Sequence, residues 1–294
     1  MTSDSTAGSV GVGGLELGYS DLGRGTPVVL LHSGGLSSRQ WTRLAEGLAP
    51  GHRMLSPDFI GYGRSSPWPR DQVFHFILDA LCVEALVDSV SEPVHLVGHS
   101  YGGFIALLAA LHRPGRVRSL ALCEPVAFGV LHSHDDVSAL ATLAEAGLGT
   151  TLLDPAIGGQ EPWLRAFVDY WNGPGSWDAL PEPANASFRA VGWKLFGEVQ
   201  SLLLDRTPHQ AYATLSVPTL VLSGESSPLA ARRVAAHLVA AIPGARGRIV
   251  EGAGHMAPIT HAEPVNRWIA DHVSGVEGAR SASALQGPGP TAEK

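Results

Sequence analysis

Short, almost wholly apolar runs alternate along the chain with longer segments in which apolar residues recur at helical spacing. The runs Pro27–Leu31, Val94–Gly98 and Pro218–Leu222 carry few polar side chains on either face, which is typical of strands in a parallel sheet that is covered on both sides. Strands that alternate with helices are joined by right-handed crossovers. The pattern therefore predicts an α/β protein with a doubly wound, mostly parallel sheet.

Further segments extend this sheet and its helical layers. Arg118–Cys123 and the shorter run Arg248–Val250 predict two more strands. The periodic segments between the runs predict helices over Asp71–Val90, Gly102–His112, Leu229–Ile242 and His261–Val273.

One interval breaks the alternation. Between Pro125 and about residue 212 no strand pattern occurs, and aromatic residues are frequent. We expect a helical cap over 125–212, inserted after the strand that ends at Glu124 and lying over the C-terminal edge of the sheet. Most of its aromatic side chains are expected to pack in the core of the cap itself.

The cap divides the chain into unequal parts. The α/β core is expected to comprise residues 15–124 and 213–274. The ends, 1–14 and 275–294, are small, polar and rich in Gly, Pro and Ala. We expect disordered tails there, because such segments bury too little surface to offset the entropy of ordering.

Composition and charge narrow the range of partners. The hydrophobic fraction of 45% and the charged fraction of 16% suit a globular protein with a substantial core. Lys and Arg total 20 against 27 Asp and Glu, a net charge of −7, so neither nucleic acid nor an anionic membrane is an expected partner. No apolar run approaches the roughly 20 residues of a membrane span, and the N-terminus lacks the pattern of a secretory signal.

The pattern of possible ligands predicts neither a metal nor a cofactor. Cys82 and Cys123 are too few for a disulfide framework or a zinc site, and both lie in apolar runs, which suits reduced thiols in a cytoplasmic protein. His132 and His134 have no matching ligand cluster. The chain also lacks a phosphate-binding loop and a dinucleotide fingerprint.

The segment Gly98–Gly102 has the pattern G-x-S-x-G, with Ser100 at its centre. It follows a predicted strand and opens a predicted helix. A turn this tight strains its central residue and requires small neighbours. It also exposes the hydroxyl at the C-terminal edge of the sheet, where open α/β sheets bind their ligands. The pattern therefore predicts a nucleophilic serine.

Four motifs follow one another along the chain: LHSGG at 31–35, PDFIGYGRS at 57–65, GHSYGG at 98–103 and GAGH at 252–255. On these motifs, the chain from Leu15 to about Val273 resembles the α/β-hydrolase superfamily. The resemblance implies that Ser100 is the nucleophile. It also implies that His255, in a Gly-rich loop after the last strand, takes the serine proton and later returns it to the leaving group.

The acid of the triad departs from the usual pattern. Where the superfamily usually has an Asp, this chain has Ser227, which cannot carry a charge. Glu225 lies two residues too early, whereas Glu124 ends the neighbouring strand, where some branches, including haloalkane dehalogenases, carry the acid. We favour Glu124, because a carboxylate beside an apolar run is costly to bury unless it is paired. Glu225 is the alternative.

The same resemblance assigns groups around the reacting carbonyl. The backbone N–H groups of Tyr101 and Gly34 would hold the oxyanion. Ser33 stands where the superfamily usually has Gly and would add a hydroxyl near the pocket. In the cap, Trp171 is a further candidate for contact with the substrate.

Three other polar residues of the motifs are expected to have structural roles. His32 is expected to brace its loop by hydrogen bonding. His99 points away from the site if Ser100 points into it, and is expected to pack. Asp58, with the glycines that follow it, is expected to shape a loop.

A serine nucleophile suits acyl transfer, in which water cleaves an acyl-enzyme. The expected partner is a small hydrophobic acyl substrate, namely a carboxylic ester, lactone or thioester, in an apolar pocket. C–C bond hydrolysis of a diketone-like compound and cofactor-free perhydrolysis use the same groups on this fold and are alternatives. A small-molecule receptor without turnover is an alternative of a different class. We expect a monomer or a homodimer.

Overall fold

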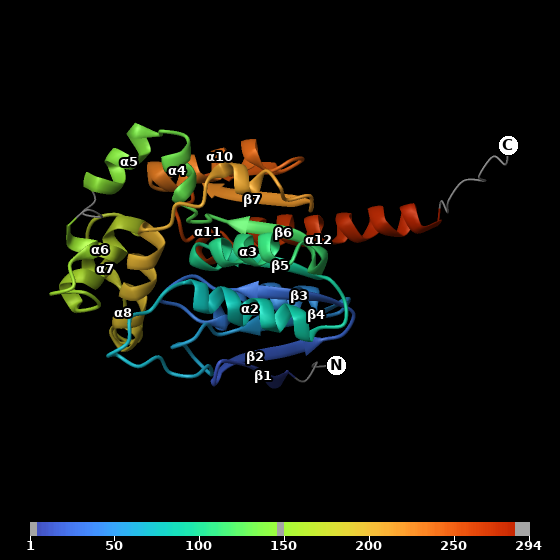
Figure 1. The fold of residues 1–294 in the computed structure, drawn as a ribbon, viewed down its shortest axis with the longest axis horizontal. Coiled ribbons are helices and arrows are strands. Elements are labelled where there is room, and N and C mark those ends of the chain that lie inside the picture. The colour runs from blue at the N-terminus through green and yellow to red at the C-terminus, as the bar shows by residue number, and fades with distance from the viewer. Residues whose placement is uncertain (1–4, 146–149, 286–294) are drawn as a thin grey trace.

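The strands form a single eight-stranded sheet in the order β1-β2-β4-β3-β5-β6-β7-β8 in the computed structural model, which describes residues 5–145 and 150–285 (Figure 1). The pairs β1–β2 and β2–β4 are antiparallel, and the other pairs are parallel. The predicted doubly wound, mostly parallel α/β sheet is therefore confirmed. The strands are β1 (Thr6–Val12), β2 (Leu15–Gly23), β3 (Thr26–Leu31), β4 (His52–Pro57), β5 (Val94–His99), β6 (Val117–Cys123), β7 (Thr219–Gly224) and β8 (Arg246–Val250).

Successive residues of the central strands face opposite helical layers, as the two-residue repeat of a strand requires. On β3, Val29 and Leu31 belong to the apolar core beneath α2, α3 and α10. Val28 and Leu30 belong to the core beneath α1 and α12. The flanking helices are α1 (Thr42–Leu48), α2 (Ile77–Ser89), α3 (Tyr101–His112), α10 (Leu229–Ala241), α11 (Ala257–Thr260) and α12 (Ala262–Leu285), with short 3₁₀ turns η1 (Ser38–Trp41) and η2 (Pro114–Arg116).

Between β6 and β7 the described residues form helices and turns without a strand. Figure 1 places α6, α7 and α8 together at one end of the sheet, beyond the C-terminal ends of the parallel strands. Aromatic side chains such as Trp163 and Trp177 are buried there. The helices of this interval are α4 (Gly129–Ser133), α5 (Val137–Leu143), η4 (Thr151–Leu153), α6 (Glu161–Asn172), α7 (Ser176–Ala179), α8 (Glu182–Leu203) and α9 (His209–Tyr212).

The two ends of the chain differ from the expected tails. Thr6–Val12 is strand β1, paired along its whole length with β2. Helix α12 continues past residue 274 to Leu285, and Glu277 lies 3.2 Å from Nε2 of His52. Strand pairing satisfies backbone polar groups whatever the side chains are, so a composition rich in small residues did not prevent order. Residues 1–4 and 286–294 lie outside the described residues.

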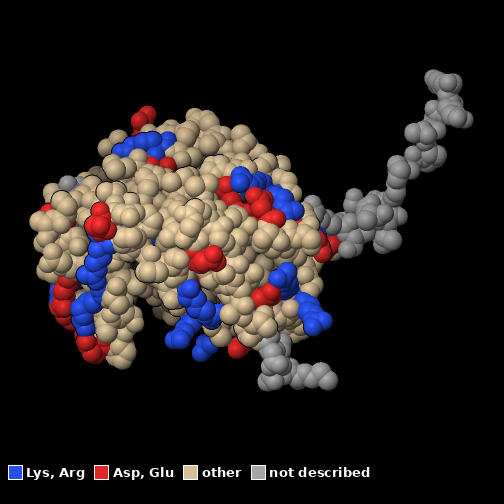
Figure 2. All heavy atoms as spheres, turned by 60° about the horizontal axis from the view of Figure 1, so that its bottom comes forward, with Lys and Arg blue, Asp and Glu red and all other residues tan. Residues whose placement is uncertain are grey.

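The surface carries charges of both signs. Figure 2 shows basic and acidic side chains interspersed on the displayed face, with wide uncharged areas between them. Among the helices that the structure describes, each is too short or too polar to cross a membrane.

Candidate active site

Ser100 lies in a strained turn between β5 and α3. Its φ angle is 54°, in the region that non-glycine residues rarely adopt. A Cβ atom on Gly98 would lie 2.3 Å from the carbonyl oxygen of Gly102, and one on Gly102 would lie 2.4 Å from that of Leu31. Only glycine fits at either position, so the sequence pattern allows the sharp bend that places the serine at the sheet edge.

Ser100, His255 and Glu124 form one hydrogen-bonded chain. Oγ of Ser100 lies 2.9 Å from Nε2 of His255, and Nδ1 of His255 lies 3.1 Å from Oε2 of Glu124. A carboxylate only accepts, so Nδ1 carries the proton and Nε2 accepts from the serine hydroxyl. The three residues expose 7%, 2% and 1% of their surface, so water barely competes for these bonds. The arrangement can activate a hydroxyl for nucleophilic attack.

Glu124 follows β6 and has a φ angle of 50°. Its Oε1 accepts a hydrogen bond of 2.9 Å from Oγ of Ser227 and another from the backbone N–H of Gly224. Glu225 points elsewhere, because its Oε2 accepts from the backbone N–H of Gly252 at 2.9 Å. The structure therefore brings Glu124, rather than Glu225, to the histidine. Ser227 stands at the chain position where the superfamily usually has the acid. Here its hydroxyl donates to the carboxylate of Glu124, which follows the neighbouring strand.

A pocket opens beside the serine. Gly34 and Tyr101 both line it, and a Cβ atom on Gly34 would lie 3.8 Å from that of Tyr101. The two candidate oxyanion donors are thus neighbours. The remaining lining residues come mostly from the cap and are mainly apolar; they are Ser100, Val126, Phe128, Leu152, Phe167, Tyr170, Trp171, Leu195, Glu198, Val199, Leu202 and Leu203.

The two residues expected to contact substrate differ in their placement. Trp171 lines the pocket and stacks on the imidazole of His255, with ring centroids 3.8 Å apart and planes at 24°. Ser33 is buried and, in the described structure, does not line this pocket. Its backbone N–H donates to Oε1 of Gln40 at 2.9 Å, and its carbonyl accepts from Nδ1 of His32 at 2.8 Å. Ser33 therefore serves the shape of its loop.

His99 does more than pack. Its Nε2 donates to the backbone carbonyl of His255 at 2.9 Å, and its Nδ1 accepts from Nε2 of Gln40 at 3.0 Å. Burial lowers the pKa of His99 to about 3, so the ring is neutral at ordinary pH. Since Gln40 also accepts from Ser33, this chain of bonds joins the Gly34 loop to the histidine loop.

The residues expected to brace loops are placed accordingly. Nε2 of His32 accepts from the backbone N–H of Phe59 at 3.0 Å, and burial lowers the pKa of His32 to about 4. The carboxylate of Asp58 accepts from the backbone N–H groups of Ser38 and Arg64. These bonds join the loops that follow β3 and β4.

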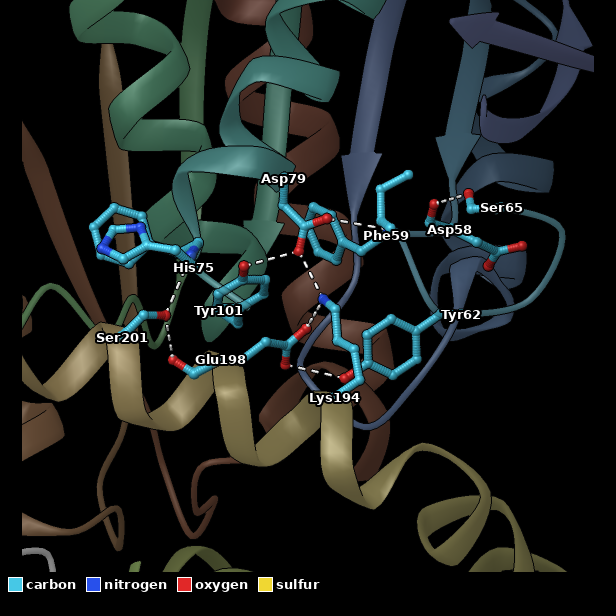
Figure 3. Close-up of polar contacts among 12 residues, drawn as sticks. Asp58, Phe59, Tyr62, Ser65, His75, Asp79, Tyr101, Lys194, Glu198 and Ser201 are labelled. Carbon is cyan, nitrogen blue, oxygen red and sulfur yellow. Dashed lines mark hydrogen bonds and ion pairs between the residues drawn. The ribbon is translucent and has the colours of Figure 1, made fainter. Parts of the chain in front are cut away.

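A second buried polar group lies between the cap helix α8 and the core (Figure 3). Nζ of Lys194, on α8, lies 2.7 Å from Oδ2 of Asp79 and also contacts Oε1 of Glu198. Oε2 of Glu198 accepts from the hydroxyl of Tyr62 at 3.0 Å, and Oδ2 of Asp79 accepts from that of Tyr101 at 2.8 Å. Burial raises the pKa of Glu198, while the charge of Lys194 opposes the rise. The group links α8 to Tyr101, the residue after Ser100.

Sequence reasoning did not identify the roles of Gln40, Ser227 or the group around Lys194. Lys194 and Glu198 are four residues apart on a helix, a spacing typical of a solvated ion pair. The weak signal is that both stand in an otherwise largely apolar stretch, V-G-W-K-L-F-G-E-V. Across the described residues, no three His, Cys, Asp or Glu side chains are grouped as metal ligands.

An open α/β sheet that carries a buried Ser-His-Glu arrangement is typical of one class of hydrolases. Residues 26–262 match the alpha/beta hydrolase fold family. The chain belongs to that family, as its motifs predicted.

Relatives of known activity support the assignment of this chain as a hydrolase. The chain is 27% identical over 274 residues to a 2-hydroxy-6-oxononadienedioate/2-hydroxy-6-oxononatrienedioate hydrolase of Paraburkholderia xenovorans, covering 90% of this chain and 92% of the relative. Among solved structures, an enol-lactonase from Burkholderia xenovorans matches with a TM-score of 0.70 and 20% identity over 91% of this chain and all of its own (100%). A haloalkane dehalogenase from Bradyrhizobium elkanii matches with a TM-score of 0.71 and 24% identity, over 94% and 99% of the two chains. At these identities the structures support the fold alone.

Proposed function

We propose that the protein is a serine hydrolase that cleaves a carboxylic ester, lactone or thioester with a hydrophobic acyl group. The observation that carries this proposal is the bond of 2.9 Å between Oγ of Ser100 and Nε2 of His255, beside a mainly apolar pocket that Ser100 lines. Glu124 supplies the charge that stabilises the imidazolium once the proton is transferred.

The geometry suits two successive acyl transfers. Oγ of Ser100 would attack the carbonyl carbon as its proton passes to Nε2 of His255. The N–H groups of Tyr101 and Gly34 would hold the resulting oxyanion. His255 would then give its proton to the leaving oxygen or sulfur, which departs and leaves an acyl-enzyme. Water, deprotonated by His255, would cleave this ester and restore the serine.

Hydrolysis of a C–C bond next to a carbonyl is the second candidate. Its support is that several relatives at 26–27% identity over most of the chain are 2-hydroxy-6-oxononadienedioate/2-hydroxy-6-oxononatrienedioate hydrolases. In that reaction His255 would protonate a carbon leaving group in place of an oxygen. Cofactor-free perhydrolysis would use the same acyl-enzyme.

A fluorophosphonate probe tests the nucleophile directly. We expect intact-mass analysis to show one adduct on Ser100, absent in Ser100→Ala and formed far more slowly in His255→Ala. A folded protein that takes no label would favour a receptor that binds without turnover. Comparing aryl esters, lactones, acyl thioesters and a vinylogous 1,5-diketone as substrates then separates ester hydrolysis from C–C cleavage.

A further inference from the structure

Glu198 is an acidic side chain in the mainly apolar wall of the pocket beside Ser100. Of the described residues that line the pocket beside Ser100, it is the only one with a carboxyl or basic side chain. It exposes 1% of its surface. Burying a carboxyl group among apolar side chains is costly unless it is hydrogen-bonded or paired. The partners of Glu198 therefore determine whether it can accept a further hydrogen bond.

The partners of Glu198 leave the buried group short of positive charge. One cation, Lys194, serves both Asp79 and Glu198. Asp79 has further donors in the backbone N–H of Ile60 and the hydroxyl of Tyr101. Within residues 5–145 and 150–285, the side chain of Glu198 has only the bond from Tyr62 beside its contact with Lys194. A carboxylate offers about four acceptor sites, so Glu198 retains capacity to accept.

The position of Glu198 makes this capacity relevant to substrate. Its Oε2 lies 2.8 Å from the point that a Cβ atom on Gly34 would occupy. Glu198 therefore touches the loop proposed to hold the oxyanion. A negative charge there opposes the charge that develops on the carbonyl oxygen. A donor on the substrate that bonds to Glu198 would offset that effect.

A second polar side chain, Tyr170, lines the same pocket. The hydroxyl of Tyr170 is buried and has no hydrogen-bond partner among the described residues. A buried hydroxyl without a partner is destabilising. Tyr170 lies on α6, whereas Glu198 lies on α8. Burial and then the charge of Glu124, rather than that of Glu198, raise the pKa of Tyr170, so the two side chains are separate polar features of the pocket wall.

We propose that Glu198 forms a polar subsite that selects an acyl group bearing a hydroxyl. A hydroxyl can donate to the acceptor capacity that Glu198 retains. It is also cheaper to desolvate in an apolar pocket than an ammonium group. This inference rests on the proposed function in taking the pocket beside Ser100 as the acyl site.

Matched esters test the subsite. The probes are the 4-nitrophenyl esters of butanoic acid, of 2- and 3-hydroxybutanoic acid, and of the corresponding methyl ethers, which keep the oxygen and lose the donor. We expect one hydroxy ester to exceed its methyl ether by roughly 10- to 100-fold in kcat/KM, the range for a hydrogen bond to a charged group. The same esters are titrated into Ser100→Ala by calorimetry, which measures selection without turnover.

Variants of the pocket wall test whether the preference comes from Glu198. In Glu198→Leu, Lys194 and Asp79 remain as a balanced pair, and the ratio of hydroxy ester to methyl ether should fall close to one. Glu198→Gln retains an acceptor and should keep part of the preference, and Tyr170→Phe, which removes a separate hydroxyl of the pocket wall, should keep the full preference. Glu182→Gln is the matched control, because Glu182 is exposed at the start of the same helix and should keep the full ratio.

The outcomes separate the two proposals. Equal kcat/KM for hydroxy and methoxy esters in an active enzyme overturns the subsite and leaves the hydrolase intact. An equal loss on every ester in both Glu198 variants also overturns it, since Glu198 is then only a counter-ion of Lys194. If no ester is cleaved while Ser100→Ala still binds the hydroxy ester more tightly, the subsite stands and the proposed function fails.

Discussion

The imidazole of His99 supports the loop that carries His255, because its Nε2 donates to the backbone carbonyl oxygen of that residue at 2.9 Å. His99 is the last residue of β5 and directly precedes Ser100. The end of β5 thus contributes both Ser100 and the side chain that anchors the loop of His255. Gln40 extends the anchor to the loop that carries Gly34.

Replacing His99 should impair catalysis without abolishing the fold. In His99→Leu the carbonyl of His255 and the amide of Gln40 lose their partner, which costs about 1–3 kcal/mol. We expect kcat for ester hydrolysis to fall roughly tenfold, the equivalent of about 1.4 kcal/mol, with little change in KM. Partial recovery in His99→Gln, which restores a donor, would mark a positioning role. An equal fall in both variants that follows their loss of melting temperature would contradict it.

The choice between the two acids can be settled by matched amides. Glu124→Gln keeps the shape of the side chain but removes the charge that stabilises the imidazolium, so kcat should fall by about 10² to 10⁴-fold. Glu225→Gln should change kcat little, because Glu225 bonds to the backbone of Gly252. Steady-state kinetics on an aryl ester provide the comparison. The reverse ranking would assign the acid to Glu225.

Ser227 should matter through Glu124. In Ser227→Ala, Oε1 of Glu124 loses one of its donors, a neutral hydrogen bond worth about 0.5–1.5 kcal/mol. We expect a fall in kcat of roughly 2- to 12-fold on this scale, and a slower reaction of Ser100 with the fluorophosphonate. Ser226→Ala, one residue earlier, is the control. A wild-type rate in Ser227→Ala would mean that the backbone N–H of Gly224 suffices to orient the carboxylate.

Buried neutral histidines should make stability depend on pH. Burial lowers the pKa of His32 to about 4 and that of His99 to about 3, against about 6.5 in an unfolded chain. Below pH 6.5 the unfolded state therefore binds protons that the folded state does not, so stability is full above pH 6.5 and declines as the pH falls toward 4.

Melting temperatures at pH 7.5, 6.0 and 5.0 measure this decline. The wild type should lose melting temperature steadily across the series, and His99→Gln should lose less. His75→Gln, which alters an exposed histidine, should match the wild type in slope. A flat profile for the wild type would argue against neutral buried rings.

The part of α12 that follows Ser274 and includes Glu277 should contribute to the stability of the fold. Ending the chain at Ser274 removes the bond from Glu277 to His52 and the buried Val276. We expect a loss of about 1–3 kcal/mol, seen as a fall in melting temperature of roughly 2–12 °C. A chain ending at Leu285 keeps these contacts and should melt like the full chain. If the chain ending at Ser274 and the full chain had equal melting temperatures, the result would support the tail expected from the sequence.

Several elements were predictable because their signals are local. The apolar runs of β3, β5, β6 and β7 are buried on both faces and stand out in any window of the chain. Strand β1 was not predictable, because its order comes from pairing with β2 rather than from its own small residues. The continuation of α12 likewise depends on contacts with His52, more than two hundred residues away.

The sequence by itself determined the family, the sheet and the bend at Ser100, because glycines and apolar runs act on their immediate neighbours. Only the tertiary structure decided which carboxylate reaches His255, that Gln40 and His99 join two loops, and that Lys194 and Glu198 are buried rather than solvated. Each of these depends on where a side chain from a distant segment points. Direction in space arises from the packing of whole elements, and spacing along the chain does not carry it.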